Sequence, residues 1–269
     1  MNNIIDDYYD GLQEIIDDSG NPDIFKISPS SLEDFFSATS TFYHEQVLGN
    51  EKQFTQSTST ILGTIIHRIL ELSADNAVPS TIDSDIDAYL AAISDPAIDI
   101  ATIRTLWKPM SKCLYDNTIG SDWVVDSTEQ FIYEKLNDDV YIGGTPDIII
   151  SDGADGYIVV DYKTSNAKPA SYPRRYKYQA YAYSWMLRNR GYNITAVRAS
   201  YITRPTKTLP ERYFEFTAPY TNETHEFIGD ILNLIAESVS LFKHNPDLRH
   251  IISQDMRNKP VPVMPSFPH

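Results

Sequence analysis

Two aspartates and a lysine stand close together in the segment between residues 143 and 163. Asp147 and Asp161 are separated by an apolar stretch, the turn-forming sequence Ser-Asp-Gly-Ala-Asp-Gly and a second apolar stretch, and Lys163 follows two residues after Asp161. This pattern predicts an antiparallel hairpin that brings both carboxylates to one edge of a sheet. Because side chains alternate along a strand, we expect Asp161 and Lys163 to share one face and Tyr162 to point to the other.

Such a group of residues suits metal-assisted hydrolysis of a phosphodiester. Two neighbouring carboxylates are unfavourable unless they share a proton or bind a cation. Their oxygens suit Mg²⁺ or Mn²⁺, which keep several waters and take further ligands from a substrate phosphate. Lys163 would supply a positive charge for the phosphate, or would orient or deprotonate the attacking water. The alternative is an ordinary hairpin with a surface Asp–Lys pair.

The same residues resemble the motif of the PD-(D/E)XK nuclease superfamily. Pro146 and Asp147 match its PD, and Asp161, Tyr162 and Lys163 match its D-x-K. The resemblance implies that Asp147 and Asp161 bind the metal and that Lys163 is catalytic. Tyr162 would add its backbone carbonyl to the metal shell, a role open to any residue type.

A predicted helix upstream carries a candidate third ligand. The segment Gly63 to Leu72 has a helical apolar period, and the Ser/Thr-rich residues before it are natural caps. His67 and Glu71 lie four residues apart, on one helix face. A core histidine is the alternative for His67, but RecB-type members of the superfamily carry a Gly-x-x-x-His helix whose histidine joins the metal site. Glu71 would act in or behind the metal shell, or is an exposed glutamate near Arg68.

A second helix, expected at residues 172–190, follows the hairpin. Gln179 and Tyr183 match the Gln-x-x-x-Tyr pattern of RecB-type nucleases. The resemblance implies that the glutamine positions the site ligands or the DNA backbone and that the tyrosine lines the substrate channel. The alternative is an aromatic-rich helix packed on the sheet, and both can hold on different faces.

The charge of the chain is unevenly distributed. The whole chain has a net charge of −15, yet residues 161–212 contain eleven Lys or Arg and only two acids, a net charge of +9. A basic segment interleaved with tyrosines is what phosphate contacts and base stacking require. The predicted DNA contacts are Arg174, Arg175, Tyr176 and Lys177.

Glu129 is a further candidate for the metal shell. It lies in the segment 122–135, whose alternation predicts a strand. Members of the superfamily complete the metal shell with an acid on a preceding strand or helix. A solvated glutamate at a strand end is the alternative.

The order of elements predicts an α/β fold, a mixed central β-sheet flanked by helices with a helical N-terminal part. We expect an acidic lead-in at 1–26, a nuclease domain at 27–244 and a Pro-rich tail at 245–269. Helices are expected within 27–48 and at 60–73, 84–94, 100–116, 172–190 and 221–243, and strands at 122–135, 139–150, 156–163, 195–203 and 211–217.

Other classes of protein are disfavoured. One cysteine, Cys113, permits neither a disulfide nor a thiolate cluster. No phosphate loop, signal peptide or membrane-spanning run occurs, so we expect a cytoplasmic protein without a motor.

The sequence therefore predicts an Mg²⁺- or Mn²⁺-dependent deoxyribonuclease, an exonuclease or DNA-end-processing enzyme of phage recombination or bacterial repair. Its partners would be DNA with free ends and, on other polypeptides, a recombinase, single-strand-binding protein or helicase. A structure-specific or RNA-directed endonuclease and an inactive DNA-binding relative remain open alternatives.

Overall fold

A computed structural model describes residues 11–47 and 56–245 of the chain. The helices are α1 (Leu12–Ser19), η1 (Pro29–Ser31), α2 (Leu32–Ser37), α3 (Thr39–Gln46), α4 (Thr58–Ala74), α5 (Ile82–Ala92), α6 (Ile100–Asp116), α7 (Arg174–Asn189) and α8 (Asn222–His244). The strands are β1 (Phe25–Ile27), β2 (Val125–Thr128), β3 (Ile132–Lys135), β4 (Val140–Gly144), β5 (Ile148–Ser151), β6 (Tyr157–Ser165), β7 (Ile194–Thr203) and β8 (Arg212–Pro219). The protein is α/β, with mixed sheets flanked by helices, as the sequence predicts.

The strands form two sheets rather than the single sheet expected. A three-stranded sheet has the order β1-β4-β3, and a five-stranded sheet has the order β2-β5-β6-β7-β8. In the larger sheet only β6 and β7 are parallel, and α7 makes the crossover between them. The boundary predicted between the lead-in (1–26) and the nuclease domain (27–244) falls within strand β1, which pairs with β4.

Two predicted strands were wrong in their extent, because each is two strands in different sheets. The segment 122–135 is divided into β2 and β3, and the segment 139–150 into β4 and β5. Pro146 explains the second break, since it lacks an N–H and restricts the residue before it. Glu129 marks the first, because its backbone is left-handed, with φ 44°. Alternation alone does not reveal either break.

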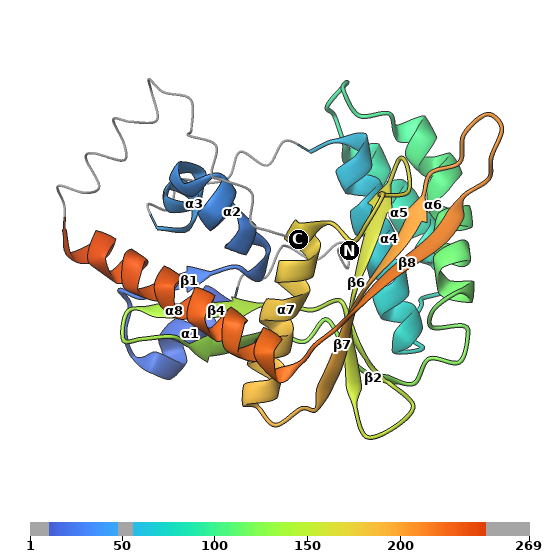
Figure 1. The fold of residues 1–269 in the computed structure, drawn as a ribbon. Helices are drawn as coiled ribbons and strands as arrows, with labels where there is room; N and C mark the ends of the chain where they lie inside the picture. The colour runs from blue at the N-terminus through green and yellow to red at the C-terminus, as the bar shows by residue number, and fades with distance from the viewer. Residues whose placement is uncertain (1–10, 48–55, 246–269) are drawn as a thin grey trace.

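Helices cover both faces of the five-stranded sheet (Figure 1). On one face the apolar core contains Ile65 and Leu70 of α4, Trp107 of α6 and Val160 of β6. On the other face it contains side chains of α7 and α8 together with Val159 of β6. The alternation of Val159 and Val160 fixes which β6 side chains face α7, and this places Asp161 and Lys163 on the α7 face. No helix within the described ranges is long and apolar enough to cross a membrane.

Candidate metal centre and active site

The predicted hairpin is present and places the two aspartates side by side. Strands β5 and β6 are antiparallel, and Ile148 is paired with Val160. One step further along this register, Asp147 stands opposite Asp161 at the end of the ladder. Asp161 is buried, with 3% of its surface exposed. Its neighbour Tyr162 packs into the core on the opposite face, as the alternation predicts.

The side chain of Asp147 takes the place of a missing ladder bond. By register, Pro146 would face Tyr162, but β5 begins only at Ile148, so the β5–β6 ladder does not reach Tyr162. The backbone N–H of Tyr162 instead donates to Asp147 Oδ2 over 2.5 Å. This bond fixes the carboxylate at the point where the two sheets diverge.

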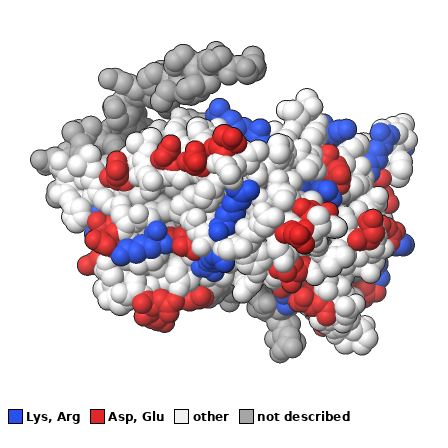
Figure 2. All heavy atoms as spheres, turned by 60° about the horizontal axis from the view of Figure 1, so that its bottom comes forward, with Lys and Arg blue, Asp and Glu red and all other residues white. Residues whose placement is uncertain are grey.

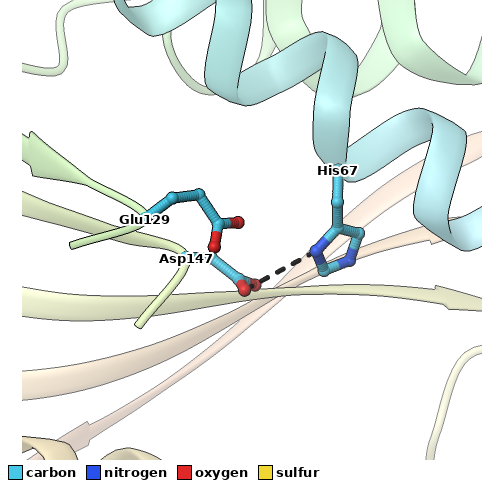
Figure 3. Close-up of side chains that lie close together, drawn as sticks. All are labelled: His67, Glu129 and Asp147. Carbon is cyan, nitrogen blue, oxygen red and sulfur yellow. Dashed lines mark ion pairs between the residues drawn. The ribbon is translucent and has the colours of Figure 1, made fainter. Parts of the chain in front are cut away.

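His67, Glu129 and Asp147 converge at this point. One ligand atom from each lies within 4.8 Å of the others, a spacing compatible with one metal ion. Figure 3 shows His67 projecting from α4 toward Asp147, with Glu129 beside it. His67 Nδ1 lies 3.6 Å from Asp147 Oδ1.

The helix α4 begins at a capping residue and holds His67 against the sheet. Ser57 accepts a hydrogen bond from the N–H of Thr60, over 3.1 Å. The rings of His67 and Tyr162 form a T-shaped pair, with 6.0 Å between centroids. The cap and the packing therefore determine where the imidazole points.

Glu129 belongs to no strand, contrary to the expectation for residues 122–135. It lies in the connection between β2 and β3, and its N–H donates to the carbonyl of Asp147 over 3.2 Å. A left-handed backbone is uncommon for a residue with a β-carbon and costs of the order of 1–3 kcal/mol. The turn directs the carboxylate toward His67 and Asp147.

The buried charges shift one another's pKa values. Burial, followed by the charge of Asp147, raises the pKa of Glu129 to about 8. Burial also opposes ionisation of Asp147, but His67 and Lys163 outweigh it and hold the pKa of Asp147 below its usual range. Burial alone would lower the pKa of His67, yet Asp147 raises it above the usual value. The group thus holds more protons than free side chains would, which is expected of a cation site without its cation.

Asp161 and Lys163 form an ion pair on the α7 face of β6. Lys163 Nζ donates to Asp161 Oδ1 over 2.7 Å and lies 4.7 Å from the centre of the Tyr176 ring. Burial raises the pKa of Asp161 to about 6, although Lys163 opposes this. Asp161 Oδ2 is buried, and among the described residues it has no hydrogen-bond partner.

These residues fit a hard divalent cation. The donors are one imidazole nitrogen and carboxylate oxygens, a set that suits Mg²⁺ or Mn²⁺ when waters complete the shell. The unpartnered oxygen of Asp161 is a further available ligand. Asp161 itself lies outside the compact His67–Glu129–Asp147 group, so its role as a ligand stays a prediction.

Glu71 lies one helical turn beyond His67 and is engaged elsewhere. Arg68 Nη1 lies 2.7 Å from Glu71 Oε2. Arg68, which the sequence suggests as a neighbour of an exposed Glu71, is thus its partner. A role of Glu71 in or behind the metal shell stays a prediction.

Gln179 and Tyr183 lie on α7, as predicted. Tyr183 is 6% exposed and belongs to the apolar core beneath α7. A β-carbon on Gly144 would lie 2.9 Å from its hydroxyl, so the close approach of β4 to Tyr183 requires a glycine. This position supports the GGTPD segment that leads to Asp147. Gln179 is half-buried, and contacts of either residue with DNA stay predictions.

The predicted DNA-contacting residues open α7. Arg174 Nε donates to Glu33 Oε1 over 3.1 Å, and Arg175 donates to Asp34, so both guanidiniums are paired with α2. Tyr176 packs over Lys163, and Lys177 is half-buried. Figure 2 shows basic side chains interspersed with acidic ones on the face it presents. The excess of basic residues in the sequence is thus partly neutralised in the fold.

The structure places two tyrosines near Asp161, Tyr172 and Tyr201, and of these only Tyr201 was missed by sequence reasoning. The hydroxyls of Tyr172 and Tyr201 are buried without a hydrogen-bond partner among the described residues. Burial first, and then the Asp161 carboxylate among other neighbours, raises the pKa of each phenol. Tyr201 faces Lys163 in the β6–β7 register, a relation that becomes visible only when the strand pairing is known.

A buried Asp161 paired with Lys163, beside an Asp147 that converges with His67 and Glu129 before β5 begins, defines an α/β protein with a candidate metal centre. The chain belongs to the PD-(D/E)XK nuclease superfamily, whose family profile matches residues 26–265.

One solved structure with a TM-score above 0.5 agrees in fold. A provisionally assigned exonuclease from Eubacterium rectale is 12% identical and superposes with a TM-score of 0.53, covering 87% of this chain and 85% of that one. An alkaline exonuclease from Laribacter hongkongensis is 11% identical with a TM-score of 0.45, covering 86% of this chain and 94% of that one. No curated protein matches the chain in sequence.

Proposed function

We propose that the protein is a divalent-metal-dependent deoxyribonuclease that hydrolyses DNA phosphodiester bonds from or near strand ends. Membership of a nuclease superfamily supports phosphodiester hydrolysis. The observation that carries the metal dependence is the convergence of His67, Glu129 and Asp147 next to the Asp161–Lys163 pair.

The metal, Mg²⁺ or Mn²⁺, would be held by His67, Asp147 and Asp161, with Glu129 as a further ligand. When bound, it would supply a Lewis acid for the phosphate and lower the pKa of a coordinated water. The ammonium of Lys163 would orient the attacking water and stabilise the additional negative charge on the phosphate. Asp161 fixes that ammonium over 2.7 Å, and the Tyr176 ring limits its movement on another side.

DNA ends are proposed as the substrate, in phage recombination or bacterial repair. The fold shared with a provisionally assigned exonuclease agrees with this proposal without deciding it. A structure-specific or RNA-directed endonuclease would use the same site residues, and no observation favours it.

The test is a time course on 5′- and 3′-labelled linear duplex, single-stranded and circular DNA, with Mg²⁺ or Mn²⁺ and with EDTA. We expect metal-dependent shortening of linear DNA that Asp161→Ala and Lys163→Ala abolish, while circular DNA stays intact. Asp155→Ala, which removes an exposed acid from the β5–β6 turn, is the matched control and should retain activity. Intact linear DNA, or cleavage that persists in Asp161→Ala, would contradict the proposal.

A further inference from the structure

The sheet face that carries Asp161 and Lys163 continues across β7 to β8. By register, Lys163 is paired with Tyr201, and Tyr201 is paired with Phe214. The next row of the same face runs from Asp161 through Ala199 to Phe216. Paired residues share a face, so the aromatic side chains of β8 lie beside the candidate active site.

The loop between β6 and α7 brings a lysine over these aromatic rings. Lys168 Nζ lies 4.8 Å from the centre of the Phe214 ring and 5.9 Å from that of Phe216. Phe216 also stacks with Tyr172, with 6.2 Å between centroids. Phe214 and Phe216 are half-buried, and Lys168 is exposed. We call Lys168, Phe214 and Phe216 the edge platform.

The charge of this surface is positive. Within the described ranges, Lys168 has no carboxylate within ion-pair distance. Glu215, the acid of β8, alternates to the other face, where it lies 3.5 Å from Arg198. Arg212 shares the face of Phe214 by alternation. The platform therefore combines flat aromatic rings with Lys168, and Arg212 lies beside it; neither cation has an acidic partner among residues 11–47 and 56–245.

We propose that the edge platform binds a single-stranded stretch of nucleic acid, with a base stacked on Phe214 and the adjoining phosphate against Lys168. Base stacking on aromatic rings beside a basic groove is a common way to bind single strands. Lys168 is exposed, so a base can replace it over the ring and leave its ammonium free for the phosphate. The inference rests on the proposed nuclease function and adds to it a site for the strand next to the cleaved bond.

The spacing sets which nucleotide is bound. Phe214 is two strands away from Lys163, about 10 Å at the usual strand separation. Nucleotides in a stacked strand are ~3.4 Å apart. The base on Phe214 is therefore expected within about three nucleotides of the phosphate at Lys163.

The experiment measures binding of full-length protein to fluorescent 12-nucleotide single strands, each with one abasic position. Ca²⁺ replaces Mg²⁺ so that the strands stay intact. In the unmodified protein, we expect one position near the cleaved end at which loss of the base weakens binding about 10-fold. In Phe214→Leu, which keeps the apolar volume and removes the ring, that position should become equivalent to its neighbours. Phe214→Tyr keeps an aromatic ring, so the position at which loss of the base weakens binding should remain.

Two further variants separate the platform from general effects. Phe227→Leu alters an exposed phenylalanine of α8 and should leave the abasic profile unchanged. Lys168→Ala should make the affinity less sensitive to salt, with a change in the slope of log K against log[salt] that corresponds to about one lost phosphate contact. Lys168→Arg keeps the charge and should leave the slope unchanged. Thermal melting of each variant confirms that it is folded.

The outcomes distinguish this inference from the nuclease proposal. Abasic profiles that are flat, or identical in the unmodified protein and Phe214→Leu, overturn the platform even if Mg²⁺-dependent cleavage is observed. A base-specific effect that disappears in Phe214→Leu supports the platform even if no cleavage occurs, in which case only the nuclease proposal fails.

Discussion

Replacing Glu129 by glutamine should stabilise the metal-free protein at alkaline pH. Burial and the nearby Asp147 charge raise the pKa of Glu129 to about 8, from 4.5 in an exposed glutamate. A carboxyl group whose pKa is higher in the folded than in the unfolded state contributes its full stability when the pH is below its unfolded pKa. This contribution is lost as the pH rises through its folded pKa. The loss between pH 4.5 and 8 is at most ~5 kcal/mol. Side-chain rotation and entering water reduce it, and we expect a difference of ~2–4 kcal/mol.

The assay is urea unfolding in EDTA at pH 5 and at pH 8. From pH 5 to pH 8, the unfolding free energy of Glu129→Gln should rise by ~2–4 kcal/mol relative to that of the unmodified protein. Glu237→Gln, at an exposed position of α8, is the control and should show no such increase.

Addition of Mn²⁺ at pH 8 should reverse the order. Glu129 in its charged form would be a metal ligand, so the unmodified protein gains more stability from the ion than Glu129→Gln. A stability difference that is the same at pH 5 and pH 8 would refute the assignment of a buried, proton-holding carboxyl group. An equal gain from Mn²⁺ in both proteins would refute its role as a ligand.

Three other predictions concern the residues that build the site. His67→Ala should weaken Mn²⁺ binding measured by calorimetry by about 100-fold or more, because loss of a residue behind the ligands already costs about 10- to 100-fold and here an imidazole ligand itself is lost; unchanged affinity would exclude His67 from the shell. Gly144→Ala should destabilise the fold by about 1–3 kcal/mol, because its β-carbon would meet the Tyr183 hydroxyl at 2.9 Å, and a combined Gly144→Ala, Tyr183→Phe variant should recover part of this loss in thermal melting. Ser57→Ala should cost about 1 kcal/mol, because it removes the cap that accepts from Thr60 N–H; a melting temperature equal to that of the unmodified protein would show that the cap does not stabilise α4.

Much of the fold could be predicted because local patterns determine it. The helices at α4, α6, α7 and α8 begin and end within about two residues of their predicted bounds, since apolar periodicity and caps act over short distances. The hairpin around residues 151–156 was likewise indicated by its turn residues. The division into two sheets could not be predicted, because alternation continues through the breaks at Glu129 and Pro146 while the strand partners change.

The site shows the same limit. The sequence could place His67, Asp147 and Asp161 on their elements, but it could not determine where they lie relative to one another. His67 packs against Tyr162 on the α4 face of the sheet, whereas Asp161 lies on the α7 face. A cation that contacts both must lie where β5 has ended and no strand separates the faces. Asp147 occupies that position because Pro146 ends the ladder and the N–H of Tyr162 anchors its carboxylate.

The position of Asp147 makes the break in the strands a requirement of the site. If β4 and β5 formed one uninterrupted strand, the N–H of Tyr162 would bond to backbone and the Asp147 carboxylate would point to one face only. His67 and Asp161 would then be separated by the sheet. The other break, between β2 and β3, leaves Glu129 outside any strand and turns it, at φ 44°, toward the group. The left-handed turn at Glu129 and the break at Pro146 thus bring His67, Glu129 and Asp147 together at the point where the two sheets diverge.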